Sequence, residues 1–185
     1  MCENSSFSII CKDCREFLKP AVKLRGNVVS FYPYEEISEL IKYKYSKFGS
    51  RVFNLLSNYS FKPFGKYLSG KLDEKIYAIG IDDRVKRGYS HTAILVKNLK
   101  SKNIKPLFSV LHATNDVSYA GKTLSFRLEN PRNFIYTGKK GIKAILVDDV
   151  LTTGTTLNEA EEVLKKNGVE VVYKIVLSDL KAKSL

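Results

Sequence analysis

The chain has 185 residues, 44% of them hydrophobic, and a formal net charge of +12 at pH 7. This length suits one ordinary α/β domain with a sizeable core and a small appendage. The sequence contains no run of about 18 apolar residues, so no membrane span is predicted. The positive charge favours anionic partners, namely nucleotides, nucleic acid or an acidic protein surface. Residues 1–20 lack the basic start and apolar core of a secretory signal, so a cytoplasmic location is expected.

Lysine supplies most of the positive charge, with 24 lysines against 7 arginines. Because bidentate contacts to bases and phosphates favour arginine, this composition argues against sequence-specific DNA recognition. Non-specific contact with a nucleic-acid backbone stays open, and salt-sensitive binding would be its signature.

All three cysteines lie in the first fourteen residues, at Cys2, Cys11 and Cys14. The C-x-x-C spacing of Cys11 and Cys14 lets two thiolates reach one metal from a tight turn, which is half of a zinc site. A closed structural site needs four ligands, and His91 and His112 belong to distant elements. The pattern therefore predicts a zinc-finger-like segment with an incomplete ligand set, and whether it binds zinc stays open.

Residues 28–32 have the pattern of a strand, and residues 35–59 are mostly helical with a break at Gly49. Residues 42–48 interleave lysines with aromatic side chains. Such a mix can stack bases and hold phosphates, as in single-strand binders. The simpler interpretation, which we favour, is an amphipathic helix with packed tyrosines and solvated lysines.

Residues 76–81 are expected to form the first core strand, followed by a helix over 92–101 and a strand over 106–111. Residues 118–138 then form a long polar segment that carries arginine and lysine. Loops of this length inside a domain are usually functional or mobile. A functional loop and an exposed basic hairpin fit this segment equally well.

The most informative stretch is residues 144–157. An apolar run, typical of a central parallel strand, ends at Asp148 and Asp149, where we expect the strand to stop. A hydroxyl-rich turn over 152–156 follows, and then residues 157–166 have the pattern of a helix. Gly168 is expected to cap this helix before a further strand over 170–177.

This arrangement places chemistry beyond the carboxyl end of a strand, where ligands of open α/β sheets bind. Backbone N–H groups at a helix start suit a phosphate, and the two carboxylates suit vicinal hydroxyls or a divalent cation. The stretch therefore predicts a pocket for a phosphorylated sugar. Neither a P-loop nor a G-x-G-x-x-G dinucleotide motif is present in the sequence.

Residues 145–156 resemble the phosphoribosyl pyrophosphate (PRPP) binding motif of type I phosphoribosyltransferases. The rest of the chain narrows the resemblance to the ComF family of bacterial competence proteins. Arg87-Gly88-Tyr89 stands where that family has an Arg-Gly-aromatic motif after the first core strand, and Arg127 and Asn130 match a later Arg and Asn. The sequence departs from the family at two places. The amides that follow the aromatic residue are replaced by Ser90 and His91, and the Gln and Leu of a Gln-x-x-Leu are replaced by Tyr119 and Lys122.

The resemblance implies an α/β fold, with a type I phosphoribosyltransferase-like parallel sheet flanked by helices and a small cysteine-rich, zinc-finger-like appendage at the N-terminus. The appendage would cover residues 1–26 and the transferase-like domain residues 27–185, with an extension over 27–70 and a core over 75–185. In the family a further C-x-x-C pair comes first. We therefore expect either that the true start lies upstream or that the zinc site has decayed.

The resemblance also implies roles for individual residues. The ribose hydroxyls of PRPP would meet Asp148 and Asp149, its sugar phosphate would lie over the following loop, and Mg²⁺ would accompany the pyrophosphate. Arg87, with a closing Arg127 or Lys122, would neutralise the departing pyrophosphate. The expected catalytic residues are Asp148, Asp149 and Arg127. The expected PRPP-binding residues are Asp148, Asp149, Val150, Leu151, Thr152, Thr153, Gly154, Thr155, Thr156 and Arg87.

Thr152 stands where hypoxanthine-guanine salvage transferases have an Asp that acts on the base. A hydroxyl cannot act as that carboxylate, so this type of salvage enzyme is disfavoured, whereas orotate- and amide-type transferases stay open.

Three functions remain. The first, which the family implies, is a cytoplasmic PRPP-binding competence factor that assists single-stranded DNA entry, with non-specific single-stranded DNA and competence or helicase-type proteins as partners. The second is an active phosphoribosyltransferase with an unidentified acceptor. The third is a PRPP-sensing regulator without turnover. The first accounts for the cysteine segment and the charge as well as the motif, while turnover stays open.

Overall fold

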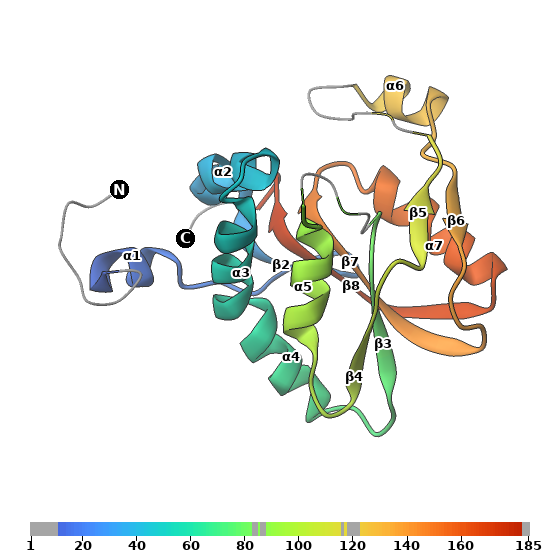
Figure 1. The fold of residues 1–185 in the computed structure, drawn as a ribbon, viewed down its shortest axis with the longest axis horizontal. Coiled ribbons are helices and arrows are strands. Elements are labelled where there is room, and N and C mark those ends of the chain that lie inside the picture. The colour runs from blue at the N-terminus through green and yellow to red at the C-terminus, as the bar shows by residue number, and fades with distance from the viewer. Residues whose placement is uncertain (1–10, 83–84, 86–87, 116, 118–122, 183–185) are drawn as a thin grey trace.

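The computed structural model describes residues 11–82, 85, 88–115, 117 and 123–182. A six-stranded sheet runs through the molecule in the order β1-β2-β8-β7-β3-β4 (Figure 1). Its strands are β1 (Lys23–Arg25), β2 (Val28–Pro33), β3 (Ile76–Gly80), β4 (Ile104–Leu107), β7 (Ile142–Leu151) and β8 (Val169–Asp179). The strands from β2 to β4 are mutually parallel, and β1 pairs antiparallel with β2 at one edge. The carboxyl ends of the parallel strands therefore share one edge of the sheet.

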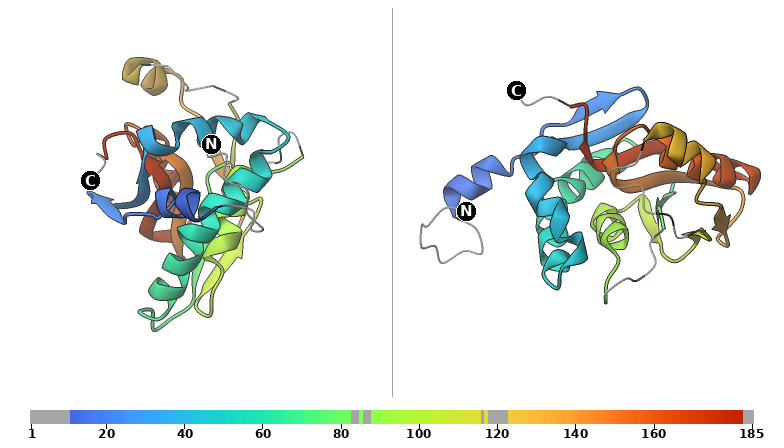
Figure 2. Two further views of the ribbon diagram at one scale, coloured as in Figure 1. Left: turned by 90° about the vertical axis from the view of Figure 1, so that its left-hand side faces the viewer. Right: turned by 90° about the horizontal axis from the view of Figure 1, so that it is seen from above.

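Helices cover both faces of the sheet (Figure 2). One face carries α2 (Tyr34–Lys42), the 3₁₀ helix η1 (Tyr43–Tyr45), α3 (Gly49–Tyr59), α4 (Phe61–Ser69) and α5 (His91–Leu99). The other carries α7 (Thr155–Lys166) and an antiparallel pair, β5 (Leu111–Ala113) with β6 (Phe134–Tyr136). Helix α6 (Leu124–Glu129) lies between β5 and β6 in the chain and projects away from the sheet, and α1 (Lys12–Phe17) precedes β1.

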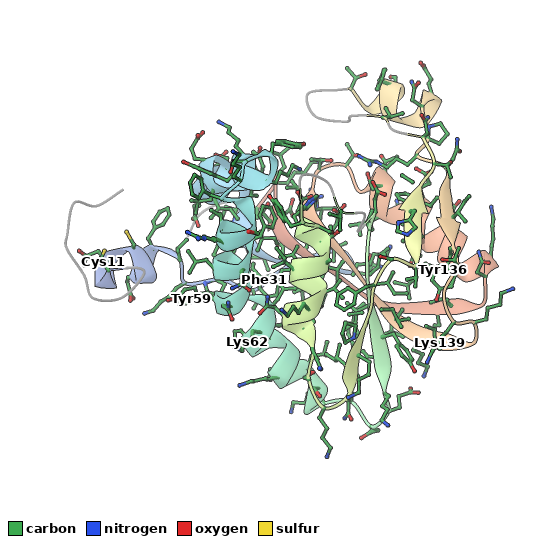
Figure 3. The ribbon with its side chains drawn as sticks, in the orientation of Figure 1. Cys11, Phe31, Tyr59, Lys62, Tyr136 and Lys139 are labelled. Atoms are coloured by element: carbon green, nitrogen blue, oxygen red, sulfur yellow. The ribbon has the colours of Figure 1, made fainter. Side chains whose placement is uncertain are left out.

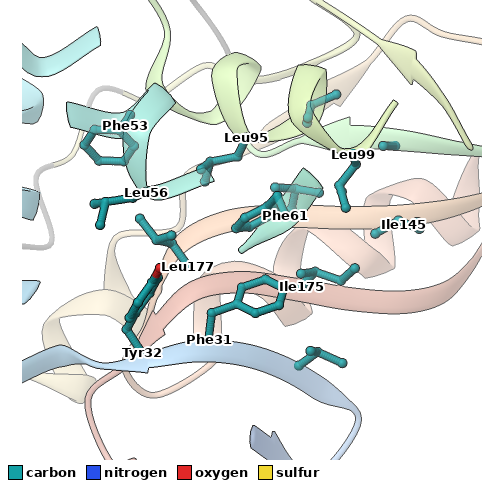
Figure 4. Packing of buried hydrophobic residues seen from close by; sticks show 14 of the residues in the cluster. Phe31, Tyr32, Phe53, Leu56, Phe61, Leu95, Leu99, Ile145, Ile175 and Leu177 are labelled. Carbon is teal, nitrogen blue, oxygen red and sulfur yellow. The ribbon is translucent and has the colours of Figure 1, made fainter. Parts of the chain in front are cut away.

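Burial on both faces explains the uninterrupted apolar run of β7. Ile145 and Val147 pack into the core under α3, α4 and α5, whereas Ala144 and Leu146 pack under α7. Successive strand side chains point to opposite faces, so a strand covered on both sides needs apolar residues at every position. Figure 4 shows the core under α3, α4 and α5, where the ring centroids of Phe31 and Phe61 are 5.0 Å apart.

Several expected elements are confirmed. The strands expected over 28–32, 76–81 and 170–177 are β2, β3 and β8, and the helices expected over 92–101 and 157–166 are α5 and α7. The helical stretch over 35–59 does divide near Gly49, which begins α3.

Two expectations are wrong. The single strand over 106–111 is two strands of different sheets, β4 and β5, separated by Ser109 in a left-handed conformation with φ 55°. The strand expected to stop at Asp148 continues to Leu151, because β8 keeps pairing with it as far as Asp179. The segment over 118–138 contains α6 and β6, while residues 118–122 lie outside the described residues.

Cys11 stands apart from the sheet, as Figure 3 shows. Cys11 is the N-cap of α1, and its Sγ accepts the N–H of Cys14 at 3.4 Å. Cys2 lies outside the described residues, among which no group of three or more His, Cys, Asp or Glu side chains could hold a metal. Zinc binding by Cys2, Cys11 and Cys14 stays a prediction.

The boundary expected after residue 26 falls at Gly26, the turn between β1 and β2, where φ is 60°. Strand β2, on the other side of that turn, lies inside the main sheet between β1 and β8. In the described part of the chain, no helix is both long and apolar enough to cross a membrane.

Candidate functional site

The acidic pair lies in the last part of β7, at the carboxyl edge of the sheet. The Asp149 side chain is almost fully buried and contacts two side chains from the face of the sheet that η1 and α5 cover. Lys44 Nζ lies 2.8 Å from Asp149 Oδ2, and His91 Nε2 lies 3.6 Å from the same oxygen. Asp148 Oδ1 accepts the Asp149 N–H at 2.8 Å. The carboxylates are thus held by specific partners and are not a solvated turn.

Lys44 comes from η1, between α2 and α3, and the loop after β3 holds this segment in place. The Tyr89 hydroxyl donates to the Lys44 carbonyl at 2.7 Å. Tyr89 lies so close to Gly49 that a Cβ at that position would be 1.8 Å from its hydroxyl oxygen. Glycine at position 49 therefore permits the contact that positions Lys44.

The two aspartates have opposite electrostatic environments. Burial alone would raise the pKa of Asp149, but the positive charges of Lys44 and His91 and the Lys44 hydrogen bond hold that pKa below its usual range. Burial, with the negative charge of Asp149 beside it, raises the pKa of Asp148 to about 8. Burial opposes the charge of Lys44, yet the adjacent Asp149 raises the pKa of Lys44 above its ordinary value. The pair therefore carries one firmly ionised carboxylate beside one that takes up a proton readily.

The hydroxyl-rich loop follows directly. Gly154 adopts φ 86° and ψ −3°, a left-handed conformation that glycine adopts without strain, and α7 begins at the next residue. The Thr153 and Thr155 hydroxyl oxygens lie 2.9 Å apart. The start of a twelve-residue helix, with threonine side chains around it, is suited to an anion such as phosphate.

A residue far away in the sequence holds this loop. Arg25, at the end of β1, donates from Nη2 to the Thr152 carbonyl at 2.8 Å. Its Nη1 lies 3.1 Å from Oδ1 of Asp179, a buried carboxylate at the end of β8. Arg25 thus links the loop after β7 to the neighbouring strand.

The β5–β6 pair borders the site and is tied to it through backbone contacts. The Glu159 carboxylate on α7 accepts the N–H groups of Arg132 at 3.1 Å and Asn133 at 2.7 Å. Asp82, which follows β3 with φ 47°, accepts the Ala113 N–H at 3.2 Å. These contacts fix the base of the segment that carries α6.

The acidic pair lies in the last part of β7, and the loop over 152–156 follows that strand directly and leads into α7. Val150 and Leu151 pack their side chains into the two cores, so their backbone is what they offer a ligand. Arg87 lies outside the described residues, as does the side chain of Arg127, whose backbone is in α6.

Sequence reasoning missed Lys44 and Arg25 as site residues. Lys44 belongs to the basic and aromatic segment over 42–48, and the mix of cations and rings in that segment is the sequence signal that points to it. The favoured interpretation of the segment, packed tyrosines with solvated lysines, is wrong for Tyr45, which is 56% exposed, and for Lys44, whose side chain is 21% exposed.

A divalent cation held by the acidic pair does not fit this donor set. Asp149 Oδ2 already accepts an ammonium group, and the described residues hold no cluster of three or more side chains able to ligate a metal. A magnesium ion at this edge would therefore come with an anionic ligand.

Acidic residues near the carboxyl end of a parallel strand, followed by a helix start suited to an anion, are an arrangement that α/β proteins use for phosphorylated ligands. Residues 109–184 match the family profile described as "Phosphoribosyl transferase domain". Orotate phosphoribosyltransferase of Pyrobaculum calidifontis is 31% identical over 138 residues, covering 63% of this chain and 68% of that protein. Competence protein F of Haemophilus influenzae is 32% identical over 89 residues, covering 48% of this chain and 29% of that protein.

The solved structure of orotate phosphoribosyltransferase from Aeropyrum pernix aligns with 70% of this chain and 59% of its own, at 22% identity and a TM-score of 0.39. On the sequence matches, the chain belongs to the phosphoribosyltransferase family, as a ComF-like protein with a type I phosphoribosyltransferase domain. The match spans less than a third of competence protein F.

Proposed function

We propose that this chain binds PRPP at the carboxyl end of β7. The observation that carries the proposal is the junction of an ionised, buried Asp149 with the hydroxyl-rich loop at the start of α7. Asp148 and Asp149 would accept the ribose hydroxyls. The sugar phosphate would lie over the backbone and the threonine hydroxyls of residues 150–156. Mg²⁺ would enter with the pyrophosphate, and Arg87 and Arg127 would neutralise that group.

The chemistry that such a site favours is departure of pyrophosphate from the ribose. An oxocarbenium-like state gains positive charge at the anomeric carbon, and a preorganised carboxylate stabilises that charge without reorganisation. Asp149 is suited to this role because Lys44 and His91 keep it ionised in a buried position. Thr152 offers a hydroxyl where a base-directed carboxylate would be needed, which favours acceptors other than hypoxanthine or guanine.

Calorimetric titration with PRPP and Mg²⁺ tests the binding. We expect the wild type to bind and Asp148→Ala/Asp149→Ala to lose binding. The control is Asp73→Ala/Glu74→Ala, an adjacent acidic pair that is exposed beside the amino end of β3 and should bind as the wild type does. Equal binding by all three proteins would place the PRPP site elsewhere, and failure of the folded wild type to bind would refute the proposal.

We further propose that PRPP binding serves a cytoplasmic role in the uptake of single-stranded DNA. The similarity to a protein named for competence supports this role, as does the segment over 42–48. Tyr45 and Phe48 are 56% and 61% exposed there, among lysines, and exposed aromatic rings with cations suit stacking on unpaired bases.

Fluorescence anisotropy with a labelled single-stranded oligonucleotide tests this role. Tyr45→Ala/Phe48→Ala should weaken binding, because each stacked base contributes about 1–3 kcal/mol. Tyr67→Ala is the control, since Tyr67 is 64% exposed on α4, outside this segment. The affinity should fall steeply with added salt. Equal losses in both variants would count against the segment over 42–48, and an absence of wild-type binding would count against the DNA role.

Two alternatives share the same site, namely an active transferase with an unidentified acceptor and a PRPP sensor without turnover. Labelled PRPP separates them. Pyrophosphate release that depends on an acceptor and is lost in Asp149→Ala indicates a transferase. A PRPP-dependent change in the affinity for DNA or a competence or helicase-type protein, without release, indicates a sensor.

A further inference from the structure

Asp149 forms an ion pair with a lysine from the N-terminal part of the chain, 105 residues away in sequence. Lys44 Nζ lies 2.8 Å from Asp149 Oδ2, and both side chains are mostly shielded from water. Ion pairs on the surface contribute little because water screens them, whereas a shielded pair holds its partners firmly and makes the removal of either one costly. Lys44 therefore has a much stronger hold on Asp149 than an exposed lysine would have.

The segment that carries Lys44 is itself fixed at its backbone. Tyr89 donates to the Lys44 carbonyl at 2.7 Å, and the missing side chain of Gly49 leaves room for the Tyr89 ring. The ammonium group also lies 5.3 Å from the centroid of the Tyr45 ring. Contacts at both ends of the residue thus aim the ammonium group at Asp149.

We propose that Lys44 is a positioning residue of the candidate site, which keeps the Asp149 carboxylate ionised and oriented toward the ribose hydroxyls and takes the place of a metal ion on that carboxylate. This inference rests on the proposed binding of PRPP. Lys44 lies outside the motif over 145–156, so a residue of the extension over 27–70 completes the site.

The charges around Asp149 give this role a distinct signature. Asp149 faces Lys44 from η1, His91 from α5 and Asp148 from its own strand. Without Lys44, burial favours the protonated acid, and His91 and the hydrogen bond with Asp148 are left to oppose it. Asp149 would then take up a proton at a higher pH and become a poorer acceptor for ribose hydroxyls as the pH falls.

Calorimetric titration of PRPP at about pH 6 and about pH 8 tests the role, with Lys44→Met, Lys44→Arg and the control Lys47→Met. Lys47 is an exposed lysine in the same segment. We expect Lys44→Met to weaken binding relative to the wild type by roughly tenfold or more at the lower pH and by clearly less at the higher pH. Lys44→Arg should restore most of the affinity, and Lys47→Met should match the wild type. Comparison with the wild type at each pH removes the titration of PRPP itself.

Failure of the inference and failure of the proposed function have different outcomes. A wild type that binds PRPP together with a folded Lys44→Met variant of equal affinity at both pH values overturns the inference and leaves the function standing. A uniform loss at both pH values, not restored by arginine, also overturns it, because a merely structural role would behave in that way. A wild type that does not bind PRPP refutes the proposed function.

Two further measurements keep the inference testable. If Lys44→Met does not fold, Tyr89→Phe removes the hydroxyl that anchors the Lys44 carbonyl and should give a smaller loss with the same pH dependence. Carbon-13 NMR of the Asp149 carboxyl group in the ligand-free protein follows its titration directly. A titration unchanged between the wild type and either variant overturns the inference without any ligand.

Discussion

Arg25 should control both the stability of the chain and the shape of the anion-binding loop. Substitution of Arg25 by Met removes a hydrogen bond to the Thr152 carbonyl at 2.8 Å and an ion pair with Asp179 at 3.1 Å. Loss of one partner of a fully buried pair costs about 3–5 kcal/mol. The Arg25 side chain is 30% exposed, and Asp179 also accepts the Lys181 N–H at 2.9 Å. Because water can reach the vacated position, we expect a smaller loss of about 1–3 kcal/mol.

Urea unfolding and PRPP titration together separate the two effects of Arg25. In Arg25→Met/Asp179→Asn the unpaired buried charge is gone, so most of the lost free energy of unfolding should return. The PRPP affinity should stay roughly tenfold below that of the wild type, since Thr152 is still unanchored. Arg51→Met, at an exposed position on α3, is the matched control. A folded Arg25→Met variant with wild-type PRPP affinity would refute the idea that Arg25 shapes the loop.

Further predictions concern pH, packing and a second ion pair. Burial raises the pKa of Asp148 in the folded chain to about 8, whereas its ordinary value is near 4. Protonated Asp148 therefore stabilises the folded chain fully below about pH 4, and this contribution is lost as the pH rises toward 8. Asp148→Asn should therefore gain stability over the wild type as the pH rises, and urea unfolding between about pH 5 and pH 9 that shows no such trend would contradict this. Gly65→Ala places a Cβ 2.7 Å from the Leu99 carbonyl oxygen, so α4 and α5 must separate, at a cost of about 1–3 kcal/mol by the same assay. Lys174 is buried and lies 2.5 Å from the more exposed Glu161, so Glu161→Gln should destabilise the chain more than Lys174→Met does, and the reverse order would be evidence against this explanation.

The elements that were predicted correctly are those whose pattern is local. The buried parts of β7 and β8 carry short apolar runs, over 144–147 and 175–177, and such runs are typical of parallel strands covered on both faces. Helix α7 buries Leu157, Ala160 and Leu164, a spacing of three and four residues that indicates a helix without any knowledge of its partners. Such signals depend on burial alone, so they are visible in a single sequence.

The elements that were predicted wrongly depend on contacts with distant parts of the chain. The apolar residues over 106–111 fit one strand, but the chain turns at Ser109 so that β4 joins β3 while β5 pairs with β6. The strand β7 passes through Asp148 and Asp149 because β8 offers pairing partners as far as Asp179. Neither outcome can be read from the residues themselves, since polar residues end most strands and here a neighbour extends one.

The candidate site divides in the same way. The acids and threonines form a contiguous motif, and their spacing alone predicts a place for a phosphorylated sugar. Lys44 and Arg25 contact that motif from 105 and 127 residues away, so their roles follow from strand order and from no local pattern.

The insertion of β2 beside β8 has a consequence for the boundaries of the functional unit. It brings β1, with Arg25, to the loop after β7, and it sends the following chain through η1, with Lys44, to the end of the same strand. A fragment that began at residue 75 would keep the acidic pair and the threonine loop but lose both cations that hold them. The buried Asp149 would then lack its closest opposing charge, and a buried carboxyl group without one favours the neutral form. The extension over 27–70 is on this argument part of the binding site, because it keeps the acid at the centre of the motif charged.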